Sequence, residues 1–212
     1  MSRGNIKPDQ ISGNTGDSAQ FLSQTGWAIP SGGGGGGGGS SSPLESHAAS
    51  SSPEIVFNGF VGAFTRYQLV ISGLRPANDS GVLRMEVSTD GGSTWSAANY
   101  QWQARGQDDG GGVGGRQNAS DSSFVLQENG LGIRTASGTA SYAAVIELFS
   151  LNQSTLYMEY LGRAFCSESG ADHRARQWNI AGSWRTAGSV NALRFKIDNG
   201  NIASGVFSIY GF

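Results

Sequence analysis

Residues 82–89 read VLRMEVST, and apolar and polar side chains alternate along them. The apolar side chains that share one face of an extended chain are Leu83, Met85 and Val87. The polar side chains on the other face are Arg84, Glu86 and Ser88. Because successive side chains of a strand point to opposite faces, this period of two predicts a β-strand with its apolar face on the core and its polar face in solvent.

The same pattern continues on both sides of this stretch. TRYQLVISGL (65–74) and ALRFKID (192–198) alternate in the same way, whereas YAAVIELF (142–149) and TLYMEYLGRAF (155–165) are apolar on both faces, as in strands covered from two sides. Further strands are expected in EIVFNGF (54–60), NYQWQAR (99–105), SFVLQ (123–127), RARQWNI (174–180) and GVFSIYGF (205–212). About nine or ten short strands and no competing amphipathic helix predict an all-β fold, an antiparallel β-sandwich or jelly-roll-like C-terminal domain preceded by an extended N-terminal arm.

Composition divides the chain into three parts. Residues 1–30 form a polar arm with a few apolar anchors, residues 31–53 a Gly/Ser-rich linker or stalk, and residues 54–212 the sandwich. The linker holds an unbroken glycine run, residues 32–39. One interpretation of this run is a flexible tether. The other is an ordered bundle of three extended chains, since glycines without Cβ atoms can approach closely.

Charge and apolar content narrow the classes of partner. A net charge of −2 without a basic block disfavours nucleic-acid binding, and no apolar run approaches the ~20 residues of a membrane span. The first residues lack an apolar signal core, so synthesis is expected in the cytoplasm. The single cysteine, Cys166, cannot form a disulfide within the chain.

Long glycine-rich segments, residues 106–123 and 128–141, are expected to be loops on the sandwich. Such loops either carry recognition or simply form mobile surface, and the sequence leaves both open.

Residues 88–95, STDGGSTW, resemble the Asp-box turn of sialidases and several carbohydrate-associated β-proteins. The positions that carry the resemblance are Ser88, Asp90, Gly92 and Trp95. Asp90 is expected to accept hydrogen bonds from nearby backbone N–H groups, Gly91 and Gly92 to adopt positive φ, and Trp95 to pack beneath. One copy of the box, with no assignable sialidase arginines or nucleophile, predicts a structural turn.

Catalytic chemistry has weak support in the sequence. A Cys166–His173 pair is one conceivable nucleophile and base, Asp108 and Asp109 a conceivable carboxylate pair, and His47 lies in the Ser-rich linker. No zinc spacing, phosphate loop or dinucleotide fingerprint is present. The sequence therefore predicts a protein that is not an enzyme and needs no cofactor or metal.

Tryptophans beside polar neighbours suggest a glycan site instead. The candidate glycan-contact residues are Trp102, Trp178 and Trp184. Their faces could stack on sugar rings while Asn, Gln or Arg side chains bind hydroxyls. The alternative is that these indoles fill the core or a subunit interface.

Two longer stretches, LRPANDSGVLRMEVSTDGGSTWSAANYQW (74–102) and VNALRFKIDNGNIASGVFSIYGF (190–212), resemble a family of structural proteins of tailed bacteriophages. IKPDQISGNTGDSAQFLSQTGWAIP (6–30) separately resembles a short element near the base of phage head and tail fibres. The resemblance implies attachment to the virion by the N-terminus, display of the C-terminal domain and assembly as a homotrimer. The implied virion-anchor candidates are Ile6, Pro8, Ile11, Phe21, Leu22 and Trp27.

Three functions follow as expectations. The first is a non-enzymatic fibre protein on the virion surface that contacts other phage structural proteins and a bacterial surface glycan. The second is a capsid decoration or cement protein whose N-terminal arm clamps capsid subunits. The third, a glycan-cleaving enzyme, has the least support. Neither nucleic acid nor membrane insertion is expected.

Overall fold

The computed structural model describes residues 42–59, 64–127, 141–167 and 175–212. Within these ranges the chain is all-β and folds into two antiparallel sheets, which confirms the predicted fold class. The described part of the chain holds no helix with the length and apolar character needed to cross a membrane.

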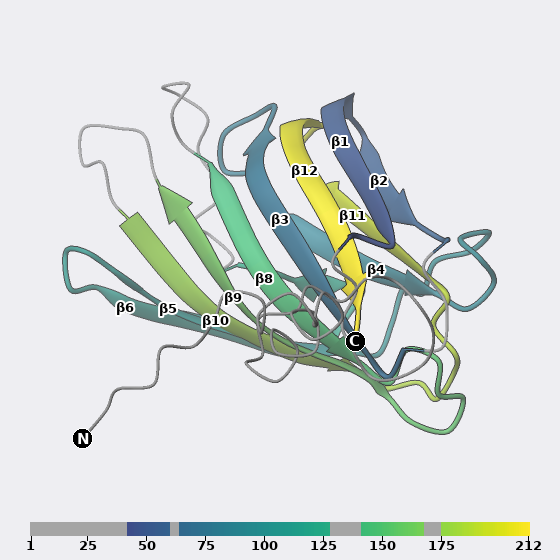
Figure 1. The fold of residues 1–212 in the computed structure, drawn as a ribbon. Helices are drawn as coiled ribbons and strands as arrows, with labels where there is room; N and C mark the ends of the chain where they lie inside the picture. Colours follow the sequence, from purple (N-terminus) through teal and green to yellow (C-terminus); the bar gives the residue numbers. More distant parts are fainter. Residues whose placement is uncertain (1–41, 60–63, 128–140, 168–174) are drawn as a thin grey trace, which may run out of the picture. The chain divides into compact units, whose positions relative to one another are not determined.

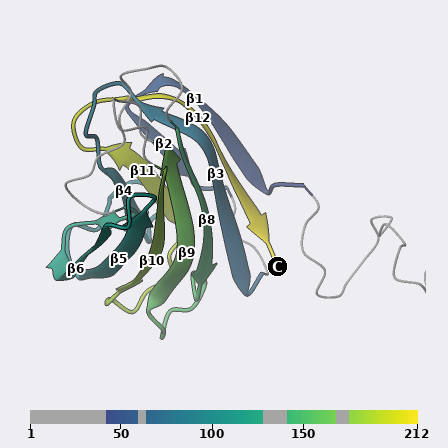
Figure 2. The ribbon, with the colours of Figure 1, turned by 90° about the vertical axis from the view of Figure 1, so that its left-hand side faces the viewer.

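The larger sheet has eight strands. Across the sheet they are β1 (Glu45–Ser52), β12 (Ile202–Gly211), β3 (Arg66–Pro76), β8 (Tyr142–Phe149), β9 (Met158–Ser167), β10 (Ala175–Trp184), β5 (Tyr100–Asp108) and β6 (Val113–Asp121). The four strands of the smaller sheet, in order, are β2 (Glu54–Phe57), β11 (Ala192–Ile197), β4 (Leu83–Ser88) and β7 (Phe124–Val125). In Figure 1 the smaller sheet lies behind the larger one, and Figure 2 shows the twist of the larger sheet from the side.

Aromatic and aliphatic side chains between the sheets form the core. Phe124 of the smaller sheet makes edge contacts with Tyr100 and Tyr160 of the larger one, with ring centroids 4.7 and 4.8 Å apart. Phe195 and Phe207 also join the two sheets, with their rings tilted at 45° and their centroids 5.5 Å apart. The apolar side chains predicted to face inward are buried: Tyr67, Leu69, Ile71, Leu83, Met85, Val87, Leu193, Phe195 and Ile197. Alternation thus predicted the face as well as the strand.

Two polar residues of β4 depart from the prediction. Glu86 and Ser88 were expected in solvent, but they are only 5 and 2% exposed. Glu86 accepts hydrogen bonds from Arg194 and pairs with Lys196 on β11, and the Ser88 hydroxyl takes part in the Asp-box turn. Neighbouring side chains therefore cover this outward face of β4.

Strands β1 and β6 were not predicted. β1 lies inside the predicted linker and pairs with β12 from Glu45 to Ser52, so the described sandwich includes residues that the sequence assigned to the linker. β6 lies inside the predicted glycine-rich loop 106–123 and pairs with β5. The glycine run 32–39 lies outside the described residues. So do the virion-anchor candidates Ile6, Pro8, Ile11, Phe21, Leu22 and Trp27.

The outer face of the larger sheet, the face turned away from the smaller sheet, is open over β8 and β9. Val145, Leu161 and Phe165 are 45, 57 and 48% exposed. The prediction that these two strands are covered from both sides is therefore wrong for the described chain. Their outward apolar side chains belong to an accessible surface.

Candidate functional site

A trough runs along β10 on the outer face of the larger sheet. β10 presents the short side chains Asn179, Ala181 and Ser183 there, which form the floor of the trough. On each neighbouring strand a longer side chain stands beside each of these residues. Asn179, Ala181 and Ser183 pair with Arg163, Leu161 and Glu159 on β9. They pair with Arg105, Gln103 and Gln101 on β5. Since side chains at paired positions stand on the same face, β9 and β5 form the two walls.

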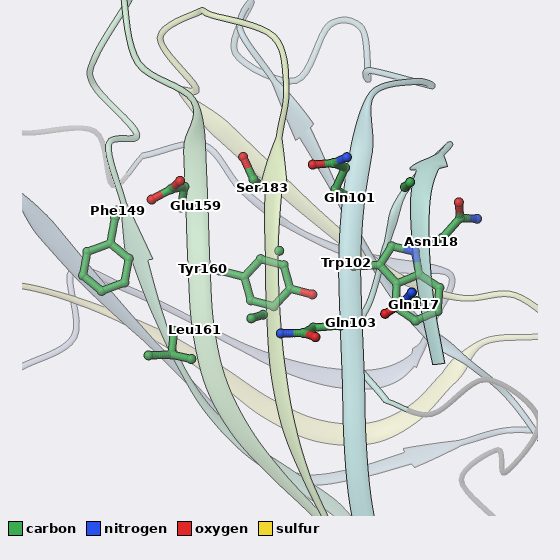
Figure 3. A pocket seen from close by; sticks show the side chains of 13 residues that line it. Gln101, Trp102, Gln103, Gln117, Asn118, Phe149, Glu159, Tyr160, Leu161 and Ser183 are labelled. Carbon is green, nitrogen blue, oxygen red and sulfur yellow. The ribbon is translucent and has the colours of Figure 1, made fainter. Parts of the chain in front are cut away.

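The Ser183 end of the trough widens into a hollow of about 590 Å³, called the amide hollow here. Gln101, Gln103 and Gln117 lie on the β5–β6 side of this hollow (Figure 3). Phe149, Glu159 and Leu161 lie on the β8–β9 side. Amides therefore face a carboxylate and two apolar side chains across a floor of small residues.

The polar side chains of the amide hollow are available to a ligand. Within the described part of the chain, no hydrogen bond or ion pair engages the side chains of Gln101, Gln103, Gln117 or Glu159. Each amide can both donate and accept hydrogen bonds, and the carboxylate of Glu159 can accept them. The hollow can therefore bind a molecule that carries several hydroxyl groups and an apolar face.

The three tryptophans predicted to contact glycan lie in the core instead. Trp102, Trp178 and Trp184 are 6, 2 and 5% exposed. The Trp184 Nε1–H donates to Ser96 Oγ at 3.0 Å, and the Trp102 Nε1–H donates to Asp121 Oδ2 at 2.9 Å. The prediction of an indole platform for sugars is wrong for these three residues, because their rings are buried. Trp102 is one of the residues that line the amide hollow, but it is only 6% exposed.

The alternation of side chains along the strands already indicates that these tryptophans face inward. Trp178, Ile180 and Trp184 share the inward face of β10, so their polar neighbours belong to the opposite face. By the same rule Gln101 and Gln103 flank the inward Trp102 but point outward. The prediction placed the site on the inward tryptophans and therefore missed the outward residues beside them, which line the amide hollow.

Asp121 anchors the buried edge of Trp102. Burial raises the pKa of the Asp121 carboxyl, but hydrogen bonds from the Trp102 indole and the Ser122 N–H outweigh it. The net pKa lies below the ordinary value. The ionised carboxylate thus holds the indole in the core rather than serving the trough.

The Asp-box turn follows β4 and forms its own network. Asp90 accepts hydrogen bonds from the Ser88 hydroxyl at 2.7 Å, the Thr94 N–H at 2.9 Å and the Thr94 hydroxyl at 2.6 Å. Gly91 and Gly92 have φ of 74 and 89°, which glycine adopts at little cost. The Arg194 guanidinium lies 4.6 Å from the centre of the Trp95 ring. None of the four Asp-box positions lines the trough.

Asp90→Ala is expected to lower the melting temperature by a few degrees and to leave ligand binding unchanged, because the carboxylate holds only the turn. Hydrogen bonds from the Thr94 hydroxyl, the Ser88 hydroxyl and the Thr94 N–H lower the Asp90 pKa from 3.8 to about 2. A carboxyl whose pKa falls on folding stabilises the folded state above its unfolded pKa, and this contribution is lost as the pH falls.

Thermal melting of wild type and variant from neutral to acid pH checks this. The difference between them should shrink as the pH falls from about 4 to about 2. A variant that melts like the wild type but fails to bind its ligand would make the Asp box functional.

The residues considered for catalysis have other partners or lie elsewhere. Cys166 is buried in the core, and His173 falls outside the described residues. Asp108 Oδ1 accepts the Gly112 N–H at 2.7 Å within the β5–β6 turn, and the Asp109 carboxylate accepts the Ala175 N–H at 3.3 Å. His47 Nε2 lies 2.6 Å from Glu45 Oε1 on β1. Among the described residues, no group of three His, Cys, Asp or Glu could hold a metal ion.

Comparison with known proteins gives no match: no family model, no curated protein and no solved structure matches this chain.

Proposed function

We propose that the protein is a non-enzymatic fibre protein of a phage virion, docked on the particle by its N-terminus, whose β-sandwich attaches to a glycan of the host surface. The observation that carries the attachment is the amide hollow, with its unpartnered amides and carboxylate beside exposed apolar side chains. The virion assignment is supported by the resemblance of residues 6–30, 74–102 and 190–212 to phage structural proteins.

The chemistry of the hollow favours a sugar over other ligands. A sugar ring offers hydroxyls that both donate and accept, which suits Gln101, Gln103 and Gln117. Its C–H face is apolar and suits Phe149 and Leu161, of which Leu161 is 57% exposed. An open hollow on a sheet also admits a polymer that is fixed to a cell, because the ligand need not enter a closed cavity.

A capsid decoration protein is the second candidate. Val145, Phe165 and Val206 are exposed apolar side chains of the larger sheet, and such side chains favour contact with another protein. The number of copies per virion distinguishes the two candidates. A few trimers per particle indicate a fibre, and a number that matches capsid lattice sites indicates decoration.

Gln103→Ala and Glu159→Ala are each expected to weaken glycan binding about two- to tenfold, since each removes a hydrogen-bonding group. Binding of the full-length protein to a panel of bacterial O-antigen and capsular polysaccharides measures this. Gln68→Ala, on β3 of the same sheet, is the matched control and should bind like the wild type. A correctly assembled wild type that binds no polysaccharide in the panel and no bacterial cell would contradict the proposal.

A further inference from the structure

The amide hollow is one part of a longer trough. It shares Leu161 with a hollow of about 340 Å³ between β8, β9 and β10. That second hollow shares Asn179 with a third, of about 490 Å³, at the other end of β10. Three hollows that share lining residues therefore extend from Ser183 at one end of β10 to Gln177 at the other, and the middle one lies mainly over β8 and β9.

The side chains that form the walls of the trough recur at every second residue of their strands. Outward residues of β10 recur every ~6.6–6.8 Å, so the floor from Ser183 to Gln177 is about 20 Å long. The β5 wall carries Gln101, Gln103, Arg105 and Gln107, and the β9 wall carries Glu159, Leu161, Arg163 and Phe165. A regular row of binding groups of this length suits a ligand that is itself a chain of similar units.

Charge differs along the trough. Arg105 and Arg163 stand on opposite walls at the level of Asn179, and in the described chain neither side chain has a hydrogen-bond or ion-pair partner. Arg105 lines the hollow of about 490 Å³ and Arg163 that of about 340 Å³, and Asn179 lines both. Three carboxylates line the same two hollows but have other partners: Asp108 and Asp109 accept the Gly112 and Ala175 N–H groups, and Glu147 pairs with Arg66. Glu159 stands at the other end, opposite Ser183. Guanidinium groups bind carboxylate or phosphate through paired N–H donors, whereas a lone carboxylate repels an anion.

We infer that the trough binds a linear acidic glycan along β10, with an anionic sugar between Arg105 and Arg163 and a neutral sugar in the amide hollow. This inference rests on the proposed attachment to a glycan. It adds the chemical class of the glycan and the positions of its sugar units along β10. Glu159 keeps the anionic unit away from the amide hollow, so the two ends of the trough select different units of one repeating chain.

The test compares linear uronic acid oligosaccharides with neutral linear glucans of the same lengths, using the full-length protein. Affinity for the acidic series should rise with chain length until the trough is filled, and should fall as salt is raised. The double variant Arg105→Gln/Arg163→Gln should lose at least about tenfold in affinity for the acidic series and nothing for the neutral one. Arg66→Gln, on the same face but 3.7 Å from Glu147, is the charge-matched control.

A second variant tests the path of the chain. Ala181→Trp fills the floor midway along the trough and should abolish the gain in affinity with chain length. Ala48→Trp makes the same change on β1 at the far edge of the sheet and should have no effect. Thermal melting shows whether each variant is folded.

Two results would overturn the inference and leave attachment to a glycan in place: preference for the neutral series, or acidic binding unchanged by the double arginine variant. Failure of the folded protein to bind any glycan would overturn both proposals. If Leu161→Gln or Phe165→Gln dissociates an oligomer in solution, the trough is an interface between copies of the chain and the inference is wrong.

Discussion

Removal of residues 205–212 is expected to leave a chain that does not fold. β12 lies between β1 and β3, so the deletion removes hydrogen-bond partners from both strands. It also removes Phe207 and Ile209, which are both 0% exposed. Each such side chain contributes about 1.5–3 kcal/mol when buried, against a total domain stability of about 5–15 kcal/mol. The free energy lost through reduced burial and through the unpaired edges of β1 and β3 should together exceed the stability of the domain.

Solubility and thermal melting of the truncated protein measure the effect. Phe207→Ala and Val206→Ala provide a matched pair on the same strand, because Phe207 faces the core and Val206 is 42% exposed. A buried Phe→Ala change costs about 3–5 kcal/mol, or roughly 6–20 °C in melting temperature, and Val206→Ala should melt close to the wild type. A soluble truncated protein with unchanged melting would contradict the assignment of β12.

The strands that could be predicted are those whose side chains alternate. In β4 and β11 the order of apolar and polar residues determines both the extended conformation and the buried face, so Leu83 and Phe195 could be placed from neighbours alone. Which strands pair is a property of the whole chain. The pairing of Tyr67 with Gly211 joins residues from opposite ends of the domain, and no local pattern indicates it.

The missed strands have compositions typical of linkers and loops. β1 reads ESHAASSS and β6 reads VGGRQNASD, which favour turns when considered alone. Both lie at the edges of the larger sheet, where one neighbouring strand supplies the hydrogen bonds. Pairing with β12 and β5 outweighs their weak propensity.

The trough could not be predicted because it depends on the register of three strands. Gln103, Leu161 and Ala181 come from distant parts of the sequence and meet only when β5, β9 and β10 pair as they do. Alternation could place each of them on an outward face. The short Ala181 between two longer neighbours, which makes the hollow, is visible only in the folded sheet.

The second large effect is expected when a buried carboxylate is removed from a cluster of charged side chains on β4 and β11. Glu86, 5% exposed, accepts hydrogen bonds from Arg194 Nε at 2.8 Å and from Arg194 Nη2, and its other oxygen pairs with Lys196. Arg194 also contacts Glu54 at 3.3 Å and covers the Trp95 ring. Glu86 therefore pairs with two cations at one place and holds the guanidinium over the Trp95 ring of the Asp-box turn.

Glu86→Ala is expected to destabilise the fold by about 2–4 kcal/mol, or roughly 4–16 °C in melting temperature. Loss of one partner of a fully buried ion pair costs about 3–5 kcal/mol, and the value here is lower because the Arg194 and Lys196 side chains are 21 and 37% exposed and keep part of their hydration. Glu54→Ala is the matched control, since it removes a carboxylate from the same arginine at a position 42% exposed, where an ion pair contributes at most about 1 kcal/mol. Denaturant unfolding of both variants measures the difference. If Glu86→Ala unfolds like Glu54→Ala, the two cations are solvated without Glu86, and its carboxylate does not hold Arg194 over Trp95.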